Sequence, residues 1–441
     1  MTETEYDVII VGGRVAGSTL AAYLGQAELR VLLLERATFP EDHPASSPMV
    51  QPSTLAMLDE IGADESAYAH NTPKIGRMIG VIDADTALAL DIPEINGRNY
   101  GYAVDRARFD AALWDNALRY PTVSGHQGFA VNSLLWDDDG QQVIGLEGRF
   151  VNNGEKAQYT AKCVVGADGR FSTVARKVEA PERDKRSEHP TTIYYGYWRN
   201  VRPFDEGSPT SVAYGAQNAT THGYLIMDSA DNTAAVCVEG RADVIAPEGG
   251  AVEPFYLEKL RENTDVWARL QGAELITKVH GMRKVGNLFR AAGGAGWALV
   301  GDAYHQKDPI DGQGIYDSVY SARTLAKAII AWHSGRTTWA DALQWYDTSA
   351  RKQMQPQYEA TLNRIQQQLY PTMSFSLPKE LVATPLRWLW NDPQYRKLAG
   401  LALNRKVAPN VTLQPRVMML AMLRGGLREL SDRLGESEAQ G

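Results

Sequence analysis

The stretch "YDVIIVGGRVAGSTLAAYLGQAELRVLLLER", residues 6–36, decides the fold of this 441-residue chain. It begins with a run of β-branched residues and continues with a segment typical of a helix that opens on small residues. It ends with an apolar run that closes on an acid. This succession predicts a β-α-β unit whose two strands are parallel. We therefore expect an α/β protein.

The turn after the first strand has the residue types that a dinucleotide pyrophosphate needs. A tight glycine turn lets the helix N-terminus point backbone N–H groups at phosphates, and an acid about twenty residues further on accepts a hydrogen bond from a ribose hydroxyl. Gly12, Gly17 and Glu35 occupy these positions. The sequence therefore predicts a dinucleotide site at this turn.

Arg14 stands where the glycine pattern has its middle glycine. A side chain here must point away from the pyrophosphate or lie along it, and Gly13 beside it can relax the turn. One interpretation is an arginine that is solvated or paired with a nearby acid. The other, which we favour, is a charged hydrogen bond to a cofactor phosphate or to the flavin edge. We also count Gly13, Ala16 and Arg36 as cofactor-binding residues.

Two later segments repeat the pattern of a buried strand that ends in a glycine turn before a helix. The first is "KCVVGADGRFSTVAR", residues 162–176, in which Asp168 follows the strand and Ser172 is placed to cap a helix. We expect this segment to contact the same cofactor.

The second segment is "GWALVGDAYHQKDPIDGQGI", residues 296–315. Its strand ends at Gly301, and Asp302 is placed to accept a hydrogen bond from a ribityl or ribose hydroxyl. The helix that follows is expected to present its first N–H groups to an electron-rich flavin edge. The residues that open this helix are Gly312, Gln313, Gly314 and Ile315.

With these segments in this order, the chain resembles the FAD-dependent aromatic hydroxylase superfamily, whose type is para-hydroxybenzoate hydroxylase. The superfamily also includes squalene epoxidases, geranylgeranyl reductases and flavin halogenases. The resemblance extends over roughly residues 5–365 and includes "VDRARFDAAL" at residues 104–113. It implies that Arg106 and the Asp168 segment contact FAD and that Asp302 binds the ribityl chain. It also implies that Pro309 lies near the isoalloxazine ring.

The resemblance also implies a reaction. NADPH or NADH reduces FAD, O₂ is the co-substrate, and a flavin C4a-hydroperoxide hydroxylates or epoxidises an aromatic or unsaturated hydrophobic small molecule of secondary metabolism. The cofactor carries this chemistry, while the protein orients the substrate and excludes water. No residue is a firm catalytic candidate. His305 and Pro309 are expected near the flavin, although His305 is equally expected to anchor its loop through the backbone.

Other functions share this scaffold. A reductase of the geranylgeranyl reductase type uses FAD without inserting oxygen, and the sequence does not exclude it. A flavin halogenase has a lysine at a second site and a Trp-x-Trp-x-Ile-Pro signature ahead of the second Gly-Asp pair. The nearest match, "WLWNDP" at residues 388–393, lies after that pair, so we interpret it as a coincidence. An escort protein without flavin chemistry would have no need of Glu35, Asp302, Gly312 and Gly314.

The predicted organisation is a Rossmann-like, GR2-type FAD-binding domain with an inserted mixed β-sheet substrate domain and a C-terminal helical extension. Strand-like runs such as "TTIYYGYW" at residues 191–198 mark the substrate sheet, and alternation turns half of its aromatic residues away from the substrate. The extension is expected to form short helices broken by prolines. The FAD domain comprises residues 1–80, 100–180 and 281–365, the substrate domain 81–99 and 181–280, and the extension 366–441.

Composition limits the partners. The formal net charge is -8 without long runs of Lys or Arg, which argues against nucleic acid. The histidines are scattered without ligand spacing, so no metal site is expected. No apolar run approaches the length of a membrane span and no signal peptide is evident, which predicts a cytoplasmic protein. We expect an aromatic or lipophilic small-molecule substrate and a monomer or homodimer. The apolar stripe near Met419 and Leu423 is expected to be core or dimer contact, with peripheral membrane contact as the alternative.

Overall fold

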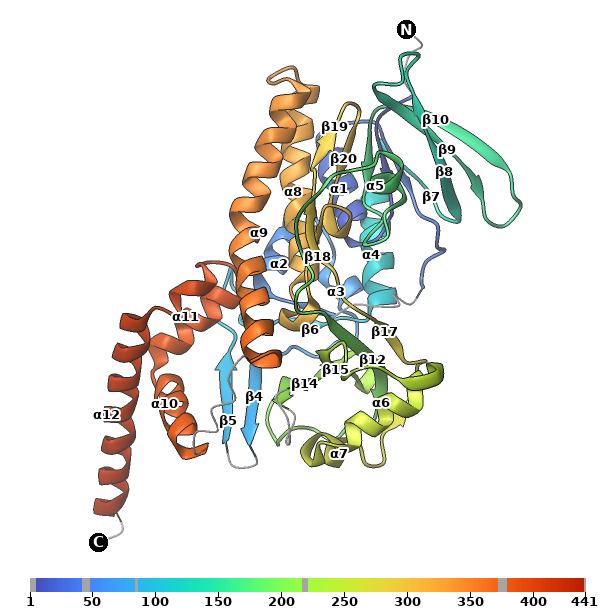
Figure 1. The fold of residues 1–441 in the computed structure, drawn as a ribbon. Coiled ribbons are helices and arrows are strands. Elements are labelled where there is room, and N and C mark those ends of the chain that lie inside the picture. Colours follow the sequence, from blue (N-terminus) through green and yellow to red (C-terminus); the bar gives the residue numbers. More distant parts are fainter. Residues whose placement is uncertain (1–4, 42–47, 84–85, 216–220, 372–378, 440–441) are drawn as a thin grey trace.

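The computed structural model describes residues 5–41, 48–83, 86–215, 221–371 and 379–439. Figure 1 shows one sheet with its helices in the upper part of the molecule, a second sheet below it, and the C-terminal helices at one side. The two sheets carry separate hydrophobic cores.

The opening stretch folds as the predicted β-α-β unit. Strand β1 (Tyr6–Val11) leads into helix α1 (Val15–Gln26) and strand β2 (Val31–Leu34). Val8 pairs in parallel with Val31 on one side and with Cys163 on the other. Since a central parallel strand is covered on both faces, its sequence is continuously apolar.

The sheet that contains β1 has the order β19-β20-β10-β1-β2-β7. Helix α1 packs against α4 and α8, so the turn before it lies between those helices and the ends of the parallel strands. The other strands are β7 (Val123–His126), β8 (Phe129–Trp136), β9 (Val143–Phe150), β10 (Lys156–Gly166), β19 (Gly293–Gly294) and β20 (Trp297–Leu299). The helices of this part are α2 (Pro52–Glu60), α3 (Glu65–Tyr68), α4 (Arg106–Leu118), α5 (Thr173–Lys177), α8 (Gly314–His333) and α9 (Trp339–Leu369).

The larger sheet has the order β16-β12-β15-β14-β13-β4-β5, and β6 joins it beside β14. Its strands are β3 (Met49–Val50), β4 (Arg77–Asp83), β5 (Thr86–Asp91), β6 (Tyr102–Ala103), β12 (Thr191–Arg199), β13 (Thr210–Gly215), β14 (His222–Ser229), β15 (Thr233–Arg241), β16 (Glu274–Leu275) and β17 (His280–Met282). Strand β4 pairs with β13, and β5 pairs with β4. The assignment of this sheet to the substrate and the domain boundaries stay predictions.

The two faces of this sheet have different environments. Helices α6 (Val252–Arg261) and α7 (Thr264–Leu270) cover one face, where Tyr194 and Trp198 are buried. Tyr195 belongs to the opposite face because side chains alternate along a strand. The aromatic side chains of β12 are thus divided between the core beneath α6 and α7 and the opposite face of the sheet, which is turned toward the part of the molecule that contains β1.

A small third sheet connects the part of the molecule that contains β1 with the part that contains the larger sheet. Strand β18 (Asn287–Arg290) lies between β11 (Glu182–Arg186) and β21 (His305–Gln306). Two short 3₁₀ segments flank β21, η3 (Gly301–Ala303) before it and η4 (Pro309–Asp311) after it. The loop between the strand end at Leu299 and helix α8 is therefore anchored on both sides.

The C-terminal extension is helical, as expected, but its prolines start helices more often than they break them. Helices α11 (Pro393–Leu403) and α12 (Pro415–Ala439) and the 3₁₀ segment η5 (Pro409–Val411) begin with proline, because the first residue of a helix has no use for its N–H. Pro385 lies inside α10 (Lys379–Asn391), and α12 runs for 25 residues, so the expectation of short helices was wrong there. The expected break at Pro378 lies outside the described residues. Of the described helices, none has the length and apolar character needed to cross a membrane.

Candidate functional site

The β1–α1 turn approaches its neighbours too closely for any side chain at two positions. Gly12 has φ +102°, and a β carbon there would lie 2.5 Å from the carbonyl oxygen of Ala167. A β carbon at Gly17 would overlap the carbonyl oxygen of Gly12. Helix α1 begins without a side-chain cap and without an acid in its first turn, which leaves its N–H groups available to an anion. The turn therefore fits a pyrophosphate.

Glu35, at the end of β2, fixes the shape of this turn. Its buried carboxylate accepts hydrogen bonds from the N–H of Gly13 at 2.7 Å and from the N–H of Ala37 at 2.9 Å. A carboxylate accepts about four hydrogen bonds, so a ribose hydroxyl can still bind it. The side chain of Arg36 next to it is exposed. Both cofactor contacts stay predictions.

Arg14 is paired with acids. Its Nη1 donates to Oδ2 of Asp110 at 2.8 Å and its Nη2 to Oε2 of Glu41 at 2.9 Å, while the guanidinium lies 5.5 Å from the ring centre of Phe39. The geometry therefore favours the first of our two interpretations, a paired arginine. The direct contact with the cofactor remains a prediction.

Asp110 is a fully buried carboxylate held by two arginines. Besides Arg14, it accepts hydrogen bonds from Arg106, from Nε at 3.1 Å and from Nη2 at 2.9 Å. A buried carboxylate that loses its partners is strongly destabilising. Burial raises the pKa of Asp302 and of Tyr197, and the positive charge of Arg106 is a smaller, opposing influence on both pKa values. Through Asp110, Arg106 is linked to Arg14 at the β1–α1 turn.

The segment around Asp168 contacts the turn through its backbone. The Asp168 carboxylate accepts from the N–H of Thr173 at 2.6 Å, and Oγ of Ser172 accepts from the N–H of Ala175 at 2.9 Å, so both side chains cap α5. The cap expected at Ser172 is present. Meanwhile, a β carbon at Gly12 would lie 2.9 Å from the α carbon of Asp168. The backbone of Asp168, more than its carboxylate, faces the expected cofactor site.

The Gly301–Asp302 pair lies against the start of α1. A β carbon at Gly301, where φ is +60°, would lie 2.8 Å from the β carbon of Ala16. Asp302 forms an ion pair with Arg170, whose Nε is 3.2 Å from Oδ2. The side chain of Asp302 is 36% exposed, which leaves it accessible to a ribityl hydroxyl.

The N-terminus of helix α8 faces open space. Asp308 caps η4 by accepting from the N–H of Ile310 at 3.1 Å, and Pro309 is the first residue of that segment. Gly312 adopts the left-handed conformation, with φ +64°. A β carbon at Gly314 would meet nothing within 4 Å, and α8 has no side-chain cap. This position fits the edge of a flavin ring, whereas Ile315 behind it packs into the core.

The side chain of Gln313 is held by the C-terminal extension. Its Oε1 accepts from Nε of Arg405 at 2.8 Å, and Nη2 of Arg405 donates to Oδ1 of Asp317 at 3.1 Å. Lys307 completes this buried network, with Nζ 2.9 Å from Asp311 and 3.0 Å from Asp317. Nothing in the local sequence indicates that Arg405 reaches the start of α8, because the two are about ninety residues apart.

His305 anchors its loop. The ring stacks on Phe289 at 3.9 Å between centroids, and Nδ1 lies 3.3 Å from the carbonyl oxygen of Leu288. Burial lowers the pKa of His305 to about 3, so the ring is neutral and Nδ1–H donates to that carbonyl. This placement favours the anchoring interpretation over a role in proton transfer.

Glu239, on β15, is a site candidate that we did not predict from the sequence. Its Oε1 is shielded from solvent, and burial, followed by the nearby carboxylate of Asp308, raises the pKa of Glu239 well above its ordinary value. Glu239 shares a sheet face with Cys237 and with Tyr195, which lies opposite Cys237 on β12. A carboxyl group that keeps its proton at the end of an apolar face is typical of functional sites. The strand pattern alone gave no indication, since it does not show what covers the face.

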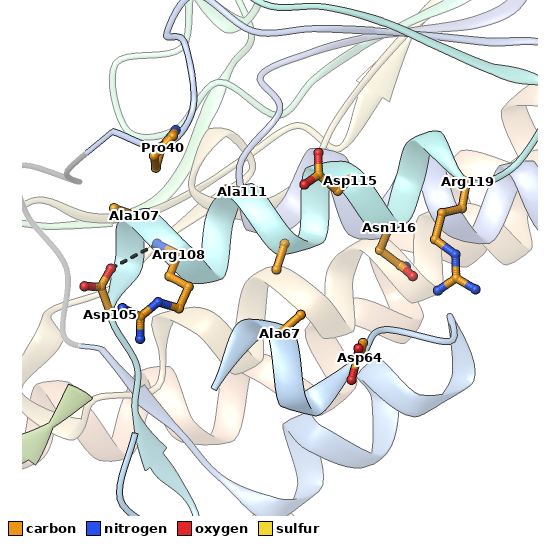
Figure 2. A pocket seen from close by; sticks show the side chains of 11 residues that line it. Pro40, Asp64, Ala67, Asp105, Ala107, Arg108, Ala111, Asp115, Asn116 and Arg119 are labelled. Carbon is orange, nitrogen blue, oxygen red and sulfur yellow. Dashed lines mark hydrogen bonds between the residues drawn. The ribbon is translucent and has the colours of Figure 1, made fainter. Parts of the chain in front are cut away.

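A groove on the described surface lies away from these residues. Figure 2 shows it between α3 and the outer side of α4, with a volume of about 620 Å³. Asp105 and Arg108 line it, and the Asp105 carboxylate caps α4 by accepting from the N–H of Arg108 at 2.9 Å. The inner side of the same helix carries Arg106 and Asp110, and none of the predicted cofactor residues lines the groove. In the described ranges, no group of His, Cys, Asp and Glu is arranged to hold a metal ion.

Comparisons with known proteins identify the family of this domain. A family model described as "FAD binding domain" matches residues 5–360. The tryptophan 2-halogenase of Chondromyces crocatus is 24% identical over 347 residues, which cover 77% of this chain and 64% of the halogenase. The digeranylgeranylglycerophospholipid reductase of Methanosarcina acetivorans is 26% identical over 324 residues, 73% of this chain and 74% of the reductase. The kynurenine 3-monooxygenase of Anopheles gambiae is 27% identical over 234 residues, 51% of this chain and 44% of that enzyme.

A solved structure of a flavin-dependent brominase has the same fold. It matches with a TM-score of 0.76 at 18% identity and covers 97% of this chain and 99% of its own. The superfamily and the α/β fold class predicted from the sequence are therefore confirmed, as is FAD as the cofactor of the matching domain.

Asp110→Asn tests the buried pairing beneath the turn. The substitution removes the charge that Arg14 and Arg106 share. We expect the free energy of unfolding to fall by about 3–5 kcal/mol, because the buried guanidinium of Arg106 loses the charge of Asp110, as does the partly exposed guanidinium of Arg14. FAD should also be released more readily. Denaturant unfolding and the fluorescence of released flavin measure the two effects. The control is Asp115→Asn, because Asp115 is exposed on the same helix. Equal stability of the two variants would contradict a stabilising role for the pairing of Asp110 with the arginines.

Gly314→Ala tests where the flavin edge lies. The added methyl group projects into open space, so the apoprotein should keep its stability while its affinity for FAD falls about tenfold. Gly17→Ala, by contrast, should destabilise the apoprotein, because its methyl group forces the turn open. Thermal unfolding of the apoproteins and titration with FAD separate the two effects. Unchanged FAD affinity in Gly314→Ala would place the ring away from α8.

Glu239→Gln tests whether this carboxyl group keeps its proton. A raised native pKa means that the unfolded chain binds fewer protons than the native state above about pH 4.5, so native stability falls as pH rises through that window. Glutamine resembles the protonated acid and does not titrate. The variant should therefore gain on the wild type by up to about 1.4 kcal/mol per pH unit in urea unfolding between pH 5 and pH 8. Exposed Glu274→Gln is the control. Parallel pH profiles of Glu239→Gln and the wild type would mean that Glu239 is ionised.

Proposed function

Because this chain belongs to the FAD-binding domain family whose model matches residues 5–360, we propose that it is an FAD-dependent monooxygenase. Its substrate is an aromatic or unsaturated hydrophobic small molecule of secondary metabolism, which it hydroxylates or epoxidises. NADPH or NADH is the reductant and O₂ the co-substrate. Flavin-dependent oxidation is the shared activity of the family, and the insertion of oxygen is the part that we propose.

The observation that carries this proposal is the apolar face of the larger sheet. Tyr195, Met227 and Cys237 are buried on it. It extends along β12 and β15 from Tyr197 to Glu239, which lies beside Asp308. The Glu239 end of the face thus adjoins the loop that contains Pro309 and precedes helix α8. An apolar, aromatic wall there binds a hydrophobic substrate and keeps water from the reacting atoms.

Bound FAD supplies the redox chemistry. The chain's own residues bind the dinucleotide at the β1–α1 turn, exclude water along the apolar face, and provide few polar groups with which to orient the substrate. Burial raises the pKa of Tyr197, so its phenol stays protonated and able to donate. At the other end of the face, burial and the nearby carboxylate of Asp308, with which Glu239 shares a hydrogen bond, raise the pKa of Glu239. A substrate with a hydroxyl or carbonyl group at one end fits this arrangement.

Halogenation is the second candidate, because a tryptophan halogenase and a brominase are among the similar proteins. That chemistry needs a lysine amine directed toward the substrate. Lys307 lies in the loop before helix α8, where we expect the flavin. Its amine is buried between the carboxylates of Asp311 and Asp317. An amine held in this way is not available to a substrate, which favours monooxygenation. Similarity to an archaeal reductase keeps reduction without oxygen as the other alternative.

A single set of reactions distinguishes these activities. The FAD-loaded protein is incubated with NADPH or NADH and a panel of electron-rich aromatic and polyunsaturated compounds, in air enriched in ¹⁸O₂ or under nitrogen, with and without bromide. We expect a product that contains one labelled oxygen atom, forms only in the presence of O₂ and is unaffected by bromide. A brominated product would establish halogenation instead. A product with two added hydrogen atoms, formed equally under nitrogen, would establish reduction. Protein stripped of FAD is the control.

A further inference from the structure

Helix α11 of the C-terminal extension ends at Leu403 in a Schellman motif. The N–H of Arg405 donates to the carbonyl oxygen of Ala402 at 3.0 Å, and the N–H of Lys406 donates to that of Leu401 at 2.9 Å. The motif needs one residue in the left-handed conformation, and glycine is the usual choice because it has no β carbon. Here Arg405 takes that position, with φ +57°. A residue keeps such a conformation where its other contacts hold it there.

The side chain of Arg405 provides these contacts, because it is buried against the start of α8 and is only 2% exposed. Its Nε donates to Oε1 of Gln313 at 2.8 Å, and its Nη2 donates to Oδ1 of Asp317 at 3.1 Å. The guanidinium also lies 5.1 Å from the ring centre of Tyr316. One planar group thus contacts the residue that precedes α8 and the first turn of that helix.

Both ends of the Gln313 amide are bound to the extension. Its Oε1 accepts from Arg405, and its Nε2 donates to the carbonyl oxygen of Leu403 at 2.7 Å. Gln313 is buried, so these two bonds fix its side chain in one orientation. The conformation of the turn that opens α8 therefore depends on the docking of the extension.

Residues 403–405, which we call the α11 corner, contact two further helices. The carbonyl oxygen of Arg405 accepts from Nε2 of Gln353 on α9 at 3.1 Å. Oδ1 of Asn404 accepts from the N–H of Ser53, in the first turn of α2, at 3.4 Å. These helices belong to the range that matches the FAD-binding family, whereas the α11 corner lies beyond residue 360, where that match ends. The corner is thus an addition of this chain to the family's domain.

The start of α8 is also where we expect the edge of the flavin. A β carbon at Gly314 would meet nothing within 4 Å, and α8 has no side-chain cap, so its first N–H groups are available to FAD. Gln313 directly precedes that glycine. Nη1 of Arg405 is buried and has no hydrogen-bond partner among the described residues, which leaves one donor of the corner for an acceptor that arrives with FAD.

Linkage makes the relation between the corner and FAD reciprocal. If docking of the corner favours the form of α8 that binds FAD, bound FAD favours docking by the same factor. We propose that Arg405 is a positioning residue for FAD, which holds the start of α8 through Gln313, so that FAD binding and docking of the α11 corner stabilise each other. The proposal depends on FAD binding, which the family establishes, and not on the reaction that follows.

Arg405→Gly separates the side chain of this residue from its backbone. Glycine suits the left-handed conformation, so α11 should fold at least as well as in the wild type. The contacts with Gln313 and Asp317 are lost, and we expect the dissociation constant for FAD to rise about tenfold in this variant and in Arg405→Met. The control is Arg424→Met, which breaks the ion pair with Asp392 inside the extension and should leave FAD affinity unchanged. Titration of the apoproteins with FAD measures these constants.

A double-mutant cycle tests whether Arg405 acts through Gln313. Gln313→Met alone removes both amide contacts with the corner and should also weaken FAD binding about tenfold. If Arg405 acts through Gln313, the double variant Arg405→Gly/Gln313→Met should bind FAD as well as either single variant does. Effects that multiply to about a hundredfold would overturn the proposal, and so would unchanged FAD affinity in Arg405→Gly.

Hydrogen exchange measures the reciprocal effect without any turnover. The amides of Arg405 and Lys406 close the Schellman motif, so their exchange reports on the docking of the corner. Saturating FAD should slow the exchange of a peptide that contains them in the wild type and in Arg424→Met. In Gln313→Met, exchange should be equal with and without FAD. Exchange in the wild type that is independent of FAD, or protection by FAD that persists in Gln313→Met, would refute the coupling.

Discussion

Three segments meet at the β1–α1 turn with no room for a β carbon between them. Gly12 lies against the backbone that precedes Asp168, Gly17 lies against Gly12 itself, and Gly301 lies against Ala16. Because of this close approach, the ends of the central parallel strands lie around the N-terminus of α1. The N–H groups of that helix have no side-chain cap, so the phosphate site and the packing of the domain depend on the same contact.

Buried charges connect this turn to the rest of the molecule. Asp110 of α4 accepts hydrogen bonds from Arg106 on the same helix and from Arg14 at the start of α1, and so joins the two helices. A second network joins Lys307, in the loop before helix α8, to Arg405 of the C-terminal extension through shared carboxylates. Removing one partner from such a network leaves an unpaired buried charge, so each network fixes a single arrangement of the elements that it joins.

The scaffold alone does not select the reaction, because halogenases, reductases and monooxygenases have sequences or folds similar to this one. In the function that we propose, the selection depends on the residues that the larger sheet turns toward the flavin. Here that face is apolar and aromatic, and Glu239 at its end is shielded from solvent. The amine of Lys307, in the loop before helix α8, is already paired with carboxylates.

The sequence by itself determined the β-α-β unit, the glycine turn and the order of the flavin segments, because strand periodicity and glycine requirements are local properties of the chain. It also indicated the sheet strands from their alternating residues. Only the tertiary structure decided that Arg14 pairs with Asp110, that Arg405 holds Gln313, and that Glu239 lies beside Asp308. These pairs join residues far apart in the chain, so their charges and pKa values depend on burial and on neighbours that no local pattern specifies.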